Sequence, residues 1–250
     1  MRVEIRQKIE RFLAEQYFCG ATELNGAEIF YTVHTEMKRP YLKIMAYRNC
    51  VVVCTSPELR AKIKRLLRKK NRDEIFEIPF VYGQTIHFVP GKIFTMEEMQ
   101  RNFPLEQDYE SAVLFGKEIS RMEGLTGFEN AVAFDGNVTP TEMACIAEKD
   151  GEIVGAAGAA HTALEDVWEI GVDVLEEHRN AGLAAALVSQ LTGELLARGI
   201  VPFYSASVTN IASQRLAGRC GYVPMWVDTF GTTLDGSSVY NEIVGELRLS

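Results

Sequence analysis

The chain has 250 residues, a formal net charge of −8 at pH 7, and hydrophobic residues at 47% of its positions. This length allows one large or two moderate hydrophobic cores, and the composition is ordinary for a globular protein. No apolar run approaches the ~20 residues that a membrane-spanning helix needs, and the N-terminal residues have no apolar signal core. The five cysteines form neither a paired framework nor a C-x-x-C motif, so we expect free thiols in a cytoplasmic protein.

The charge is distributed unevenly along the chain. Residues 1–100 hold 17 Lys and Arg against 12 Asp and Glu, whereas residues 101–250 hold 9 against 22. Such an asymmetry indicates two domains with different surfaces. We place the division at the segment 82–91, whose Tyr-Gly-Gln and Pro-Gly sequences are typical of turn and loop. The prediction is therefore an N-terminal α/β domain over 1–91, of unassigned role, and a second domain over 92–250.

The N-terminal domain mixes helical and strand patterns. Residues 6–16 have an apolar face at helical spacing, and strands are predicted at 27–31, 41–46 and 50–54. Cys50 and Cys54, in the last of these strands, are expected in the core. The sequence 55–58 predicts a capped helix start. The outer face of that helix carries Arg60, Lys62, Lys64, Arg65, Arg68, Lys69 and Lys70.

This basic face is interpreted as a solvated surface. The alternatives are contact with nucleic acid or with the acidic second domain. No aromatic residues alternate with the cations, as base stacking would require. We therefore expect no nucleic-acid partner.

The second domain begins with a helical pattern over 94–125 that Pro104 interrupts. Two strand patterns follow, at 143–147 and 152–157. The sequence Lys149-Asp150-Gly151 between them favours a tight turn, so the two strands are predicted to form a hairpin.

Residues 170–184 are the most informative stretch of the chain. Ile170, Val172 and Val174 alternate with Gly171 and Asp173, which predicts a half-buried strand. The sequence Arg179-x-x-Gly182-x-Ala184 then predicts a tight turn that opens directly into a helix. That helix has leucines at steps of four residues, at positions 183, 187, 191 and 195. A strand, a small-residue turn and a helix N-terminus in this order favour a binding site for phosphate.

The segments after this helix extend the pattern. A strand is predicted at 201–208, a short helix at 211–219 with Asn210 as its N-cap, and a further strand at 222–227. Over residues 140–230 this order of elements and motifs resembles the GCN5-related N-acetyltransferase (GNAT) superfamily. The matching residues are Val174, Arg179, Gly182, Ala184, Asn210, Ser213, Leu216, Gly221, Tyr222 and Pro224.

The resemblance implies an α/β fold with a mixed sheet, in which a GNAT-type acetyltransferase core follows a smaller α/β domain. It also implies acetyl-CoA as cosubstrate, with its pyrophosphate on the turn and its pantetheine arm between the strands at 169–175 and 201–208. The cofactor-binding residues expected on this basis are Val172, Val174, Arg179, Asn180, Ala181, Gly182, Leu183, Ala184, Asn210 and Ser213. No metal is expected. Gly171 either marks a β-bulge that starts the separation of the strands or packs beneath a neighbour.

The catalytic candidates follow from the chemistry of acetyl transfer. An attacking amine must lose a proton, and we select Glu169 as the base, with Asp173 and His161 as alternatives. The resemblance implies a backbone N–H near Asp173 or Val174 for the oxyanion. Many family members carry a tyrosine acid at the position held here by Ala217. Tyr204 is the candidate acid in its place, with Tyr222, Ser213 and water as alternatives.

The expected function is acetyl transfer to a primary amine of a small molecule by direct attack in a ternary complex. The acidic second domain favours a cationic acceptor. The alternatives are a non-catalytic acyl-CoA-binding sensor or interaction protein, for which Ala217 is the argument, and a peptide or protein N-acetyltransferase. We expect no membrane partner, and leave a homodimer open as an alternative to a monomer.

Overall fold

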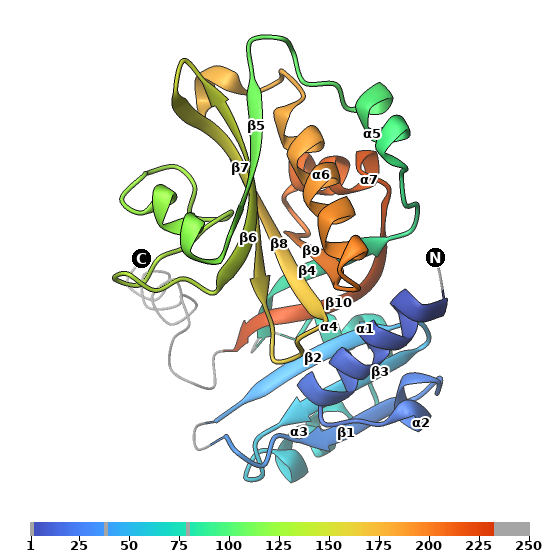
Figure 1. Ribbon diagram of the computed structural model, residues 1–250. Helices are drawn as coiled ribbons and strands as arrows, with labels where there is room; N and C mark the ends of the chain where they lie inside the picture. Colours follow the sequence, from blue (N-terminus) through green and yellow to red (C-terminus); the bar gives the residue numbers. More distant parts are fainter. Residues whose placement is uncertain (1–2, 38–39, 79–80, 233–250) are drawn as a thin grey trace, which may run out of the picture. The chain divides into compact units, whose positions relative to one another are not determined.

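The computed structural model describes residues 3–37, 40–78 and 81–232 (Figure 1). Within these ranges the chain divides into two compact units. Unit 1 comprises residues 3–9, 88–206 and 210–224, and unit 2 comprises the described residues of 10–87, 207–209 and 225–232. The domain boundary between residues 91 and 92 stays a prediction.

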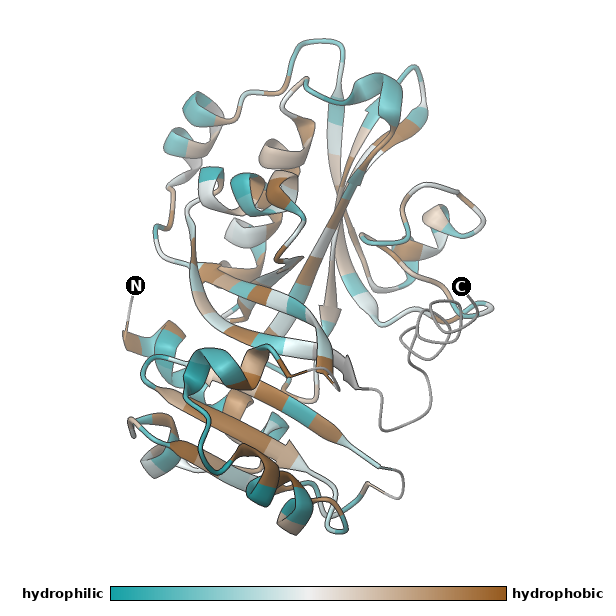
Figure 2. Cartoon of the chain, turned by 180° about the vertical axis from the view of Figure 1, so that it is seen from behind, coloured by the Kyte–Doolittle hydropathy of each residue, from teal (hydrophilic) through white to brown (hydrophobic). Residues whose placement is uncertain are grey.

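Unit 2 is built on a mixed sheet. In it, β1 (Ile29–Val33) pairs in parallel with β3 (Cys50–Thr55), and β2 (Leu42–Tyr47) pairs antiparallel with β3 and with β10 (Tyr222–Thr232). Every residue of β3 is buried, so this strand is covered on both faces. Cys50 and Cys54 lie in this core, as predicted. The hydrophobic colour of these strands contrasts with the hydrophilic parts of the surrounding helices (Figure 2).

The helices of unit 2 pack against this sheet. They are α1 (Val3–Gln16), which begins in unit 1, α2 (Ala21–Leu24), α3 (Arg60–Leu67) and α4 (Arg72–Phe76). The predicted capped start of α3 at 55–58 is wrong. The Ser56 hydroxyl donates instead to the Glu58 carboxylate at 2.8 Å and accepts from the Tyr41 backbone N–H, so α3 begins only at Arg60.

The prediction of turn and loop over residues 82–91 is also wrong. It lies almost entirely in β4 (Val81–Pro90), a strand of ten residues. Val81, Phe88 and Val89 are buried in it, and this tertiary burial outweighs the turn preference of Tyr82-Gly83-Gln84.

Unit 1 contains the strand order β9-β8-β7-β6-β5. The strands are β5 (Glu110–Phe115), β6 (Thr141–Lys149), β7 (Glu152–His161), β8 (Val167–Val174) and β9 (Val201–Ser207). Neighbours are antiparallel except β8 and β9, which are parallel. Both units therefore have mixed strand pairing, and the predicted α/β class with a mixed sheet is confirmed.

The helical elements of unit 1 connect these strands. They are α5 (Met96–Asn102), the 3₁₀ helices η1 (Gly116–Met122) and η2 (Glu176–His178), α6 (Leu183–Ala197) and α7 (Ile211–Arg219). The helical prediction over 94–125 is wrong for residues 110–115, which form β5. Hydrogen bonding to β6 along its whole length makes this segment a strand.

Two local predictions in unit 1 are confirmed. The hairpin of β6 and β7 turns at Asp150 and Gly151, which have positive φ angles of 53° and 83°. The four leucines of α6 at positions 183, 187, 191 and 195 are each at most 1% exposed. In the described chain no helix combines the length and apolar character that crossing a membrane requires.

The two faces of the unit 1 sheet carry different structures (Figure 1). On one face α6 packs against β6, β7 and β8, and Gly155 makes room for Leu187 of α6. On the other face the segment 128–132 lies so close that a Cβ at Gly158 would stand 1.9 Å from the Ala131 carbonyl oxygen. This arrangement gives each side chain of β8 a defined face.

Candidate active site

A fork between two parallel strands forms one end of the site. β8 and β9 pair from Val167–Val201 to Ile170–Tyr204, and their pairing stops there although both strands continue. On its other edge β8 stays paired with β7 as far as Val174. The edge of β8 from Gly171 to Val174 therefore presents backbone groups that β9 does not use, and such an edge suits an extended, amide-bearing ligand.

The turn that follows β8 exposes the start of α6. Asn180 and Gly182 have positive φ angles of 68° and 81°, and Gly182 is the N-cap of the helix. A Cβ built on Gly182 would have no heavy atom within 4 Å, so the space in front of this helix end is open. In the described part of the chain, the backbone N–H groups of residues 181–184 make no hydrogen bond. The turn therefore offers donors at the positive end of a helix dipole.

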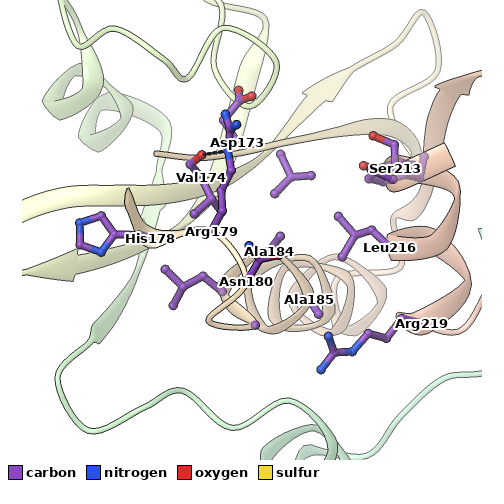
Figure 3. Close-up of a pocket in the computed structure, with 15 residues that line it drawn as sticks. Asp173, Val174, His178, Arg179, Asn180, Ala184, Ala185, Ser213, Leu216 and Arg219 are labelled. Atoms are coloured by element: carbon purple, nitrogen blue, oxygen red, sulfur yellow. Dashed lines mark hydrogen bonds between the residues drawn. The ribbon is translucent and has the colours of Figure 1, made fainter. Parts of the chain in front are cut away.

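A groove of about 430 Å³ connects the fork with this turn. Figure 3 shows that its walls come from the end of β8, the turn, the first residues of α6, and α7. Two cations line it from different elements, Arg179 from the turn and Arg219 from α7. Arg179 is held in place because its Nε donates to the Val174 carbonyl oxygen at 3.1 Å.

The structure brings most of the predicted cofactor residues together in this groove. Those that line it are Val172, Val174, Arg179, Asn180, Gly182, Leu183, Ala184 and Ser213. Ala181 and Asn210 are not among the lining residues. Asn210 has a structural task instead, because its Oδ1 accepts the Ser213 backbone N–H at 3.1 Å and caps α7.

Further lining residues were not among the predicted cofactor residues. They are His178, Ala185, Ala212, Leu216 and Arg219. The last three lie on α7, and only the packing of α7 beside α6 places them opposite the turn. His178 is fixed on its other side, since its Nδ1 lies 3.1 Å from the Tyr109 hydroxyl.

Glu169 lies at the base of the fork. It belongs to the last paired residues of β8, and its carboxylate accepts a hydrogen bond from the Ser205 hydroxyl of β9. The side chain is exposed. Strand alternation places it on the same face of β8 as Gly171 and Asp173, opposite to α6. His161 is paired with Trp168, so it belongs to the opposite face from Glu169.

The Asp173 carboxylate makes more hydrogen bonds than that of Glu169. Its carboxylate accepts the Asn130 backbone N–H at 2.7 Å, the Asn130 side-chain amide at 2.7 Å and the Ala131 backbone N–H at 2.9 Å. These three donors hold the segment 128–132 against β8 and occupy the carboxylate.

Gly171 packs beneath the same segment. A Cβ there would stand 1.6 Å from the Asn130 carbonyl oxygen, and the β7–β8 register runs through Gly158–Gly171 without interruption. The structure therefore selects the packing explanation for Gly171, and the alternative of a β-bulge at this position is wrong.

Tyr204 closes the fork at the inner end of the groove. It is 3% exposed, lines the groove and shares a hydrogen bond with the Ser213 side chain. Burial raises the pKa of its phenol, so the hydroxyl stays protonated at neutral pH. Ala217 is fully buried and is not among the residues that line the groove. Across the described residues, no group of three or more His, Cys, Asp and Glu side chains is placed to hold a metal ion.

Comparisons with known proteins agree with this geometry. The sequence model of the acetyltransferase (GNAT) family matches residues 104–222. Residues 104–222 of the chain therefore form a GNAT acetyltransferase domain. This GNAT domain runs from the segment before β5 to the start of β10, so it begins earlier in the chain than the sequence resemblance over 140–230. The fork, the turn and the groove all lie within it, and the matched family is one of acetyltransferases.

A solved structure has the same fold. A GCN5-related N-acetyltransferase-like protein from Streptococcus suis is 18% identical, with a TM-score of 0.51, over 78% of this chain and 84% of that one. A GNAT-family protein from Novosphingobium aromaticivorans is 18% identical, with a TM-score of 0.45, over 59% of this chain and 63% of that one. The chain thus covers less than two thirds of the second protein. A search among curated proteins found no match.

Proposed function

We propose that the protein transfers the acetyl group of acetyl-CoA to a primary amine of a small molecule in a ternary complex. The observation that carries the proposal is the strand fork at Ile170–Tyr204, which opens into a groove that ends at a helix N-terminus. When bound, acetyl-CoA supplies an acetyl group activated as a thioester.

The residues present fit this cosubstrate. The free N–H groups of residues 181–184 suit a pyrophosphate, because they lie at a helix N-terminus where Gly182 leaves open space. Arg179 and Arg219 add positive charge to the lining of the same groove. The free edge of β8 from Gly171 to Val174 suits the amides of a pantetheine arm. The groove volume of about 430 Å³ is in the range of small-molecule sites.

Glu169 is the proposed base. An ammonium group has no lone pair, so the acceptor must lose a proton before it attacks. Glu169 is exposed at the base of the fork. The Asp173 carboxylate, in contrast, accepts three N–H hydrogen bonds that hold it in place. The Ser205 hydroxyl orients the Glu169 carboxylate. Because Glu169 lies on the sheet face opposite to α6, the amine is expected to approach from that face.

Tyr204 is the proposed proton donor to the leaving thiolate. Its phenol lies where the fork closes, in contact with the groove, and its raised pKa keeps the proton on the oxygen. The hydrogen bond with Ser213 fixes the position of the hydroxyl. In this proposal Tyr204 takes the task of the tyrosine that many family members carry at the position of Ala217.

One observation favours a second candidate function. Ala217 cannot donate a proton, and this suits a non-catalytic protein that binds an acyl-CoA and reports it to a partner. The two functions differ in turnover. Release of free CoA thiol from acetyl-CoA in the presence of a panel of polyamines, amino sugars and peptides is expected for the enzyme. Binding without thiol release across the panel would favour the sensor, and release with peptides alone would favour peptide acetylation.

The groove itself is tested by charge reversal at the turn. Gly182→Glu is expected to weaken CoA binding at least about tenfold, because a carboxylate then stands at the anion site and φ is positive there. Gly136→Glu is the matched control. Its φ is +60° and the space around it is also open, but it lies outside the groove. Equal affinity of wild type and Gly182→Glu in calorimetry would contradict this assignment.

A further inference from the structure

A strongly basic surface covers the outer side of α3 and continues to the first residue of α4. Residues 59–72 contain eight of the 26 Lys and Arg residues of the chain and no Asp or Glu. This is a local concentration of positive charge in a protein with a net charge of −8. We call it the α3 basic surface; it consists of Arg60, Lys62, Lys64, Arg65, Arg68, Lys69, Lys70 and Arg72.

The core of unit 2 fixes the direction of these side chains. Ile63 and Leu67 of α3 are each 1% exposed and pack in a hydrophobic cluster with residues of β2, β3 and α4. With this face of the helix buried, the basic residues face outward, and all of them except Lys70 are exposed. The positive charge is therefore presented by a helix whose opposite face is anchored in the core.

The positive charge of this surface is not neutralised within the described chain. Its eight cations form no ion pair there. The Lys64 ammonium lies 5.6 Å from the centre of the Tyr31 ring, and the Arg72 guanidinium donates to the Arg48 carbonyl oxygen. Like charges three or four residues apart repel one another on a helix, so binding of an anionic partner would reduce this repulsion.

An exposed leucine distinguishes the kind of anion. Leu66 is 49% exposed and lies on α3 among the cations. The phosphate groups of a nucleic acid offer no apolar surface to Leu66, and residues 59–72 contain no aromatic side chain on which bases could stack. An acidic polypeptide offers both kinds of group, because carboxylates pair with Arg and Lys and an apolar side chain covers Leu66.

We propose that the α3 basic surface binds an acidic segment of a partner protein, with Leu66 as the apolar contact among the charges. This inference rests on charge, exposure and packing in unit 2, and it is independent of the reaction proposed for the GNAT domain. It makes a partner-docking function for this unit testable without knowledge of the acceptor.

The full chain tests this with fluorescence anisotropy. The probe is a labelled peptide of about 15 residues, rich in Asp and Glu with one central Leu, at about 50 mM salt, where screening is weak. Lys62→Glu with Lys69→Glu is expected to weaken binding at least about tenfold. Arg101→Glu with Lys117→Glu is the matched control, since both residues are exposed and lie in unit 1. This control variant is expected to bind within about twofold of the wild type.

The leucine is tested separately. Leu66→Ser is expected to weaken binding about threefold or more, whereas Leu125→Ser, at a leucine that is 44% exposed in unit 1, leaves it unchanged. Circular dichroism confirms that each variant is folded before it is measured.

Four results would overturn the proposal. The first two are no peptide binding at low salt and equal losses of affinity in the test and control variants. The third is tighter binding of a labelled RNA or DNA duplex, or of anionic lipid vesicles, than of the peptide. The fourth is concentration-dependent self-association that Lys62→Glu with Lys69→Glu abolishes. The last result would assign the surface to a second copy of this chain.

Discussion

Asp173 and Asn130 are joined by two hydrogen bonds of 2.7 Å, one from the Asn130 backbone N–H and one from its side-chain amide. The two residues are 43 positions apart in the sequence. Their contact attaches the segment 128–132 to the face of β8 on which Glu169 also lies. Asp173 therefore shapes the surroundings of Glu169, the proposed base.

Asp173→Asn is expected to destabilise the protein by about 1–3 kcal/mol, because it removes a charged acceptor and places an amide donor against N–H groups. Chemical denaturation measures this loss. Asp135→Asn, at an exposed aspartate, is the control and is expected to stay within about 0.5 kcal/mol of the wild type. If Asp173→Asn kept full stability and lost all activity, Asp173 rather than Glu169 would be the base.

Gly171→Ala is expected to cost about 3 kcal/mol or more. Its methyl group would stand 1.6 Å from the Asn130 carbonyl oxygen, so backbone must move to admit it. Gly218→Ala is the matched control in the exposed part of α7, where an added Cβ meets nothing within 4 Å. That change is expected to stabilise by about 0.5–1 kcal/mol. Thermal unfolding compares the two, and a Gly171→Ala protein as stable as the wild type would contradict the close packing.

Glu169→Gln is expected to lower the rate of acetyl transfer about 10- to 10⁴-fold, the range that follows loss of a general base. Affinity for CoA should change little, because Glu169 is not among the residues that line the groove. Steady-state kinetics over a range of pH, with calorimetry for CoA, separate the two effects. Glu165→Gln is the control at a nearby exposed position. Full activity of Glu169→Gln across pH would transfer the role to Asp173, His161 or water.

Tyr204→Phe is expected to lower kcat about tenfold or more, because the leaving thiolate loses its proton donor. Burial raises the pKa of Tyr204 above its ordinary value of 10.0, so the wild-type donor should remain protonated throughout the neutral range. Tyr222→Phe is the control. Its hydroxyl is also buried, 2.7 Å from the Thr192 hydroxyl, but it is outside the groove. Equal kcat values for the wild type and Tyr204→Phe would transfer the role of proton donor to Tyr222, Ser213 or water.

A buried carboxylate gives unit 2 a predictable response to acid. Asp228 is 4% exposed and binds the Tyr17 hydroxyl at 2.6 Å, the Lys43 ammonium at 2.9 Å and His87 Nε2 at 3.0 Å. Burial acts to raise its pKa, but the contacts with His87, Lys43 and Tyr17 outweigh burial and hold the pKa below its ordinary value of 3.8.

This lowered pKa sets the direction of the pH effect. The carboxylate contributes stability above its unfolded pKa, and the contribution disappears as the pH falls through the lower folded value. The wild type should therefore lose stability between about pH 5 and pH 2 more steeply than Asp228→Asn. Urea unfolding at several pH values measures both slopes. Parallel slopes would show that the Asp228 contacts do not favour its ionised form.

The sequence by itself determined the strand, turn and helix at 170–184. Their signals are local: alternation in β8, Gly182 at a positive φ, and leucines at steps of four in α6. The turn at Asp150-Gly151 was predictable for the same reason. Predictions from local sequence failed where tertiary packing outweighed the local conformational preference. Examples are β4 and β5, whose pairing partners lie far away in the chain.

Only the tertiary structure decided which contacts the residues around the turn make. Asp173 and Glu169 are both carboxylates on one face of one strand, and the sequence does not distinguish them. The contact with Asn130, which is distant in the sequence, occupies Asp173 and leaves Glu169 exposed at the fork. Likewise, Arg219 faces the groove because α7 packs beside α6. Such relationships depend on the packing of distant segments, which residue spacing along one segment does not encode.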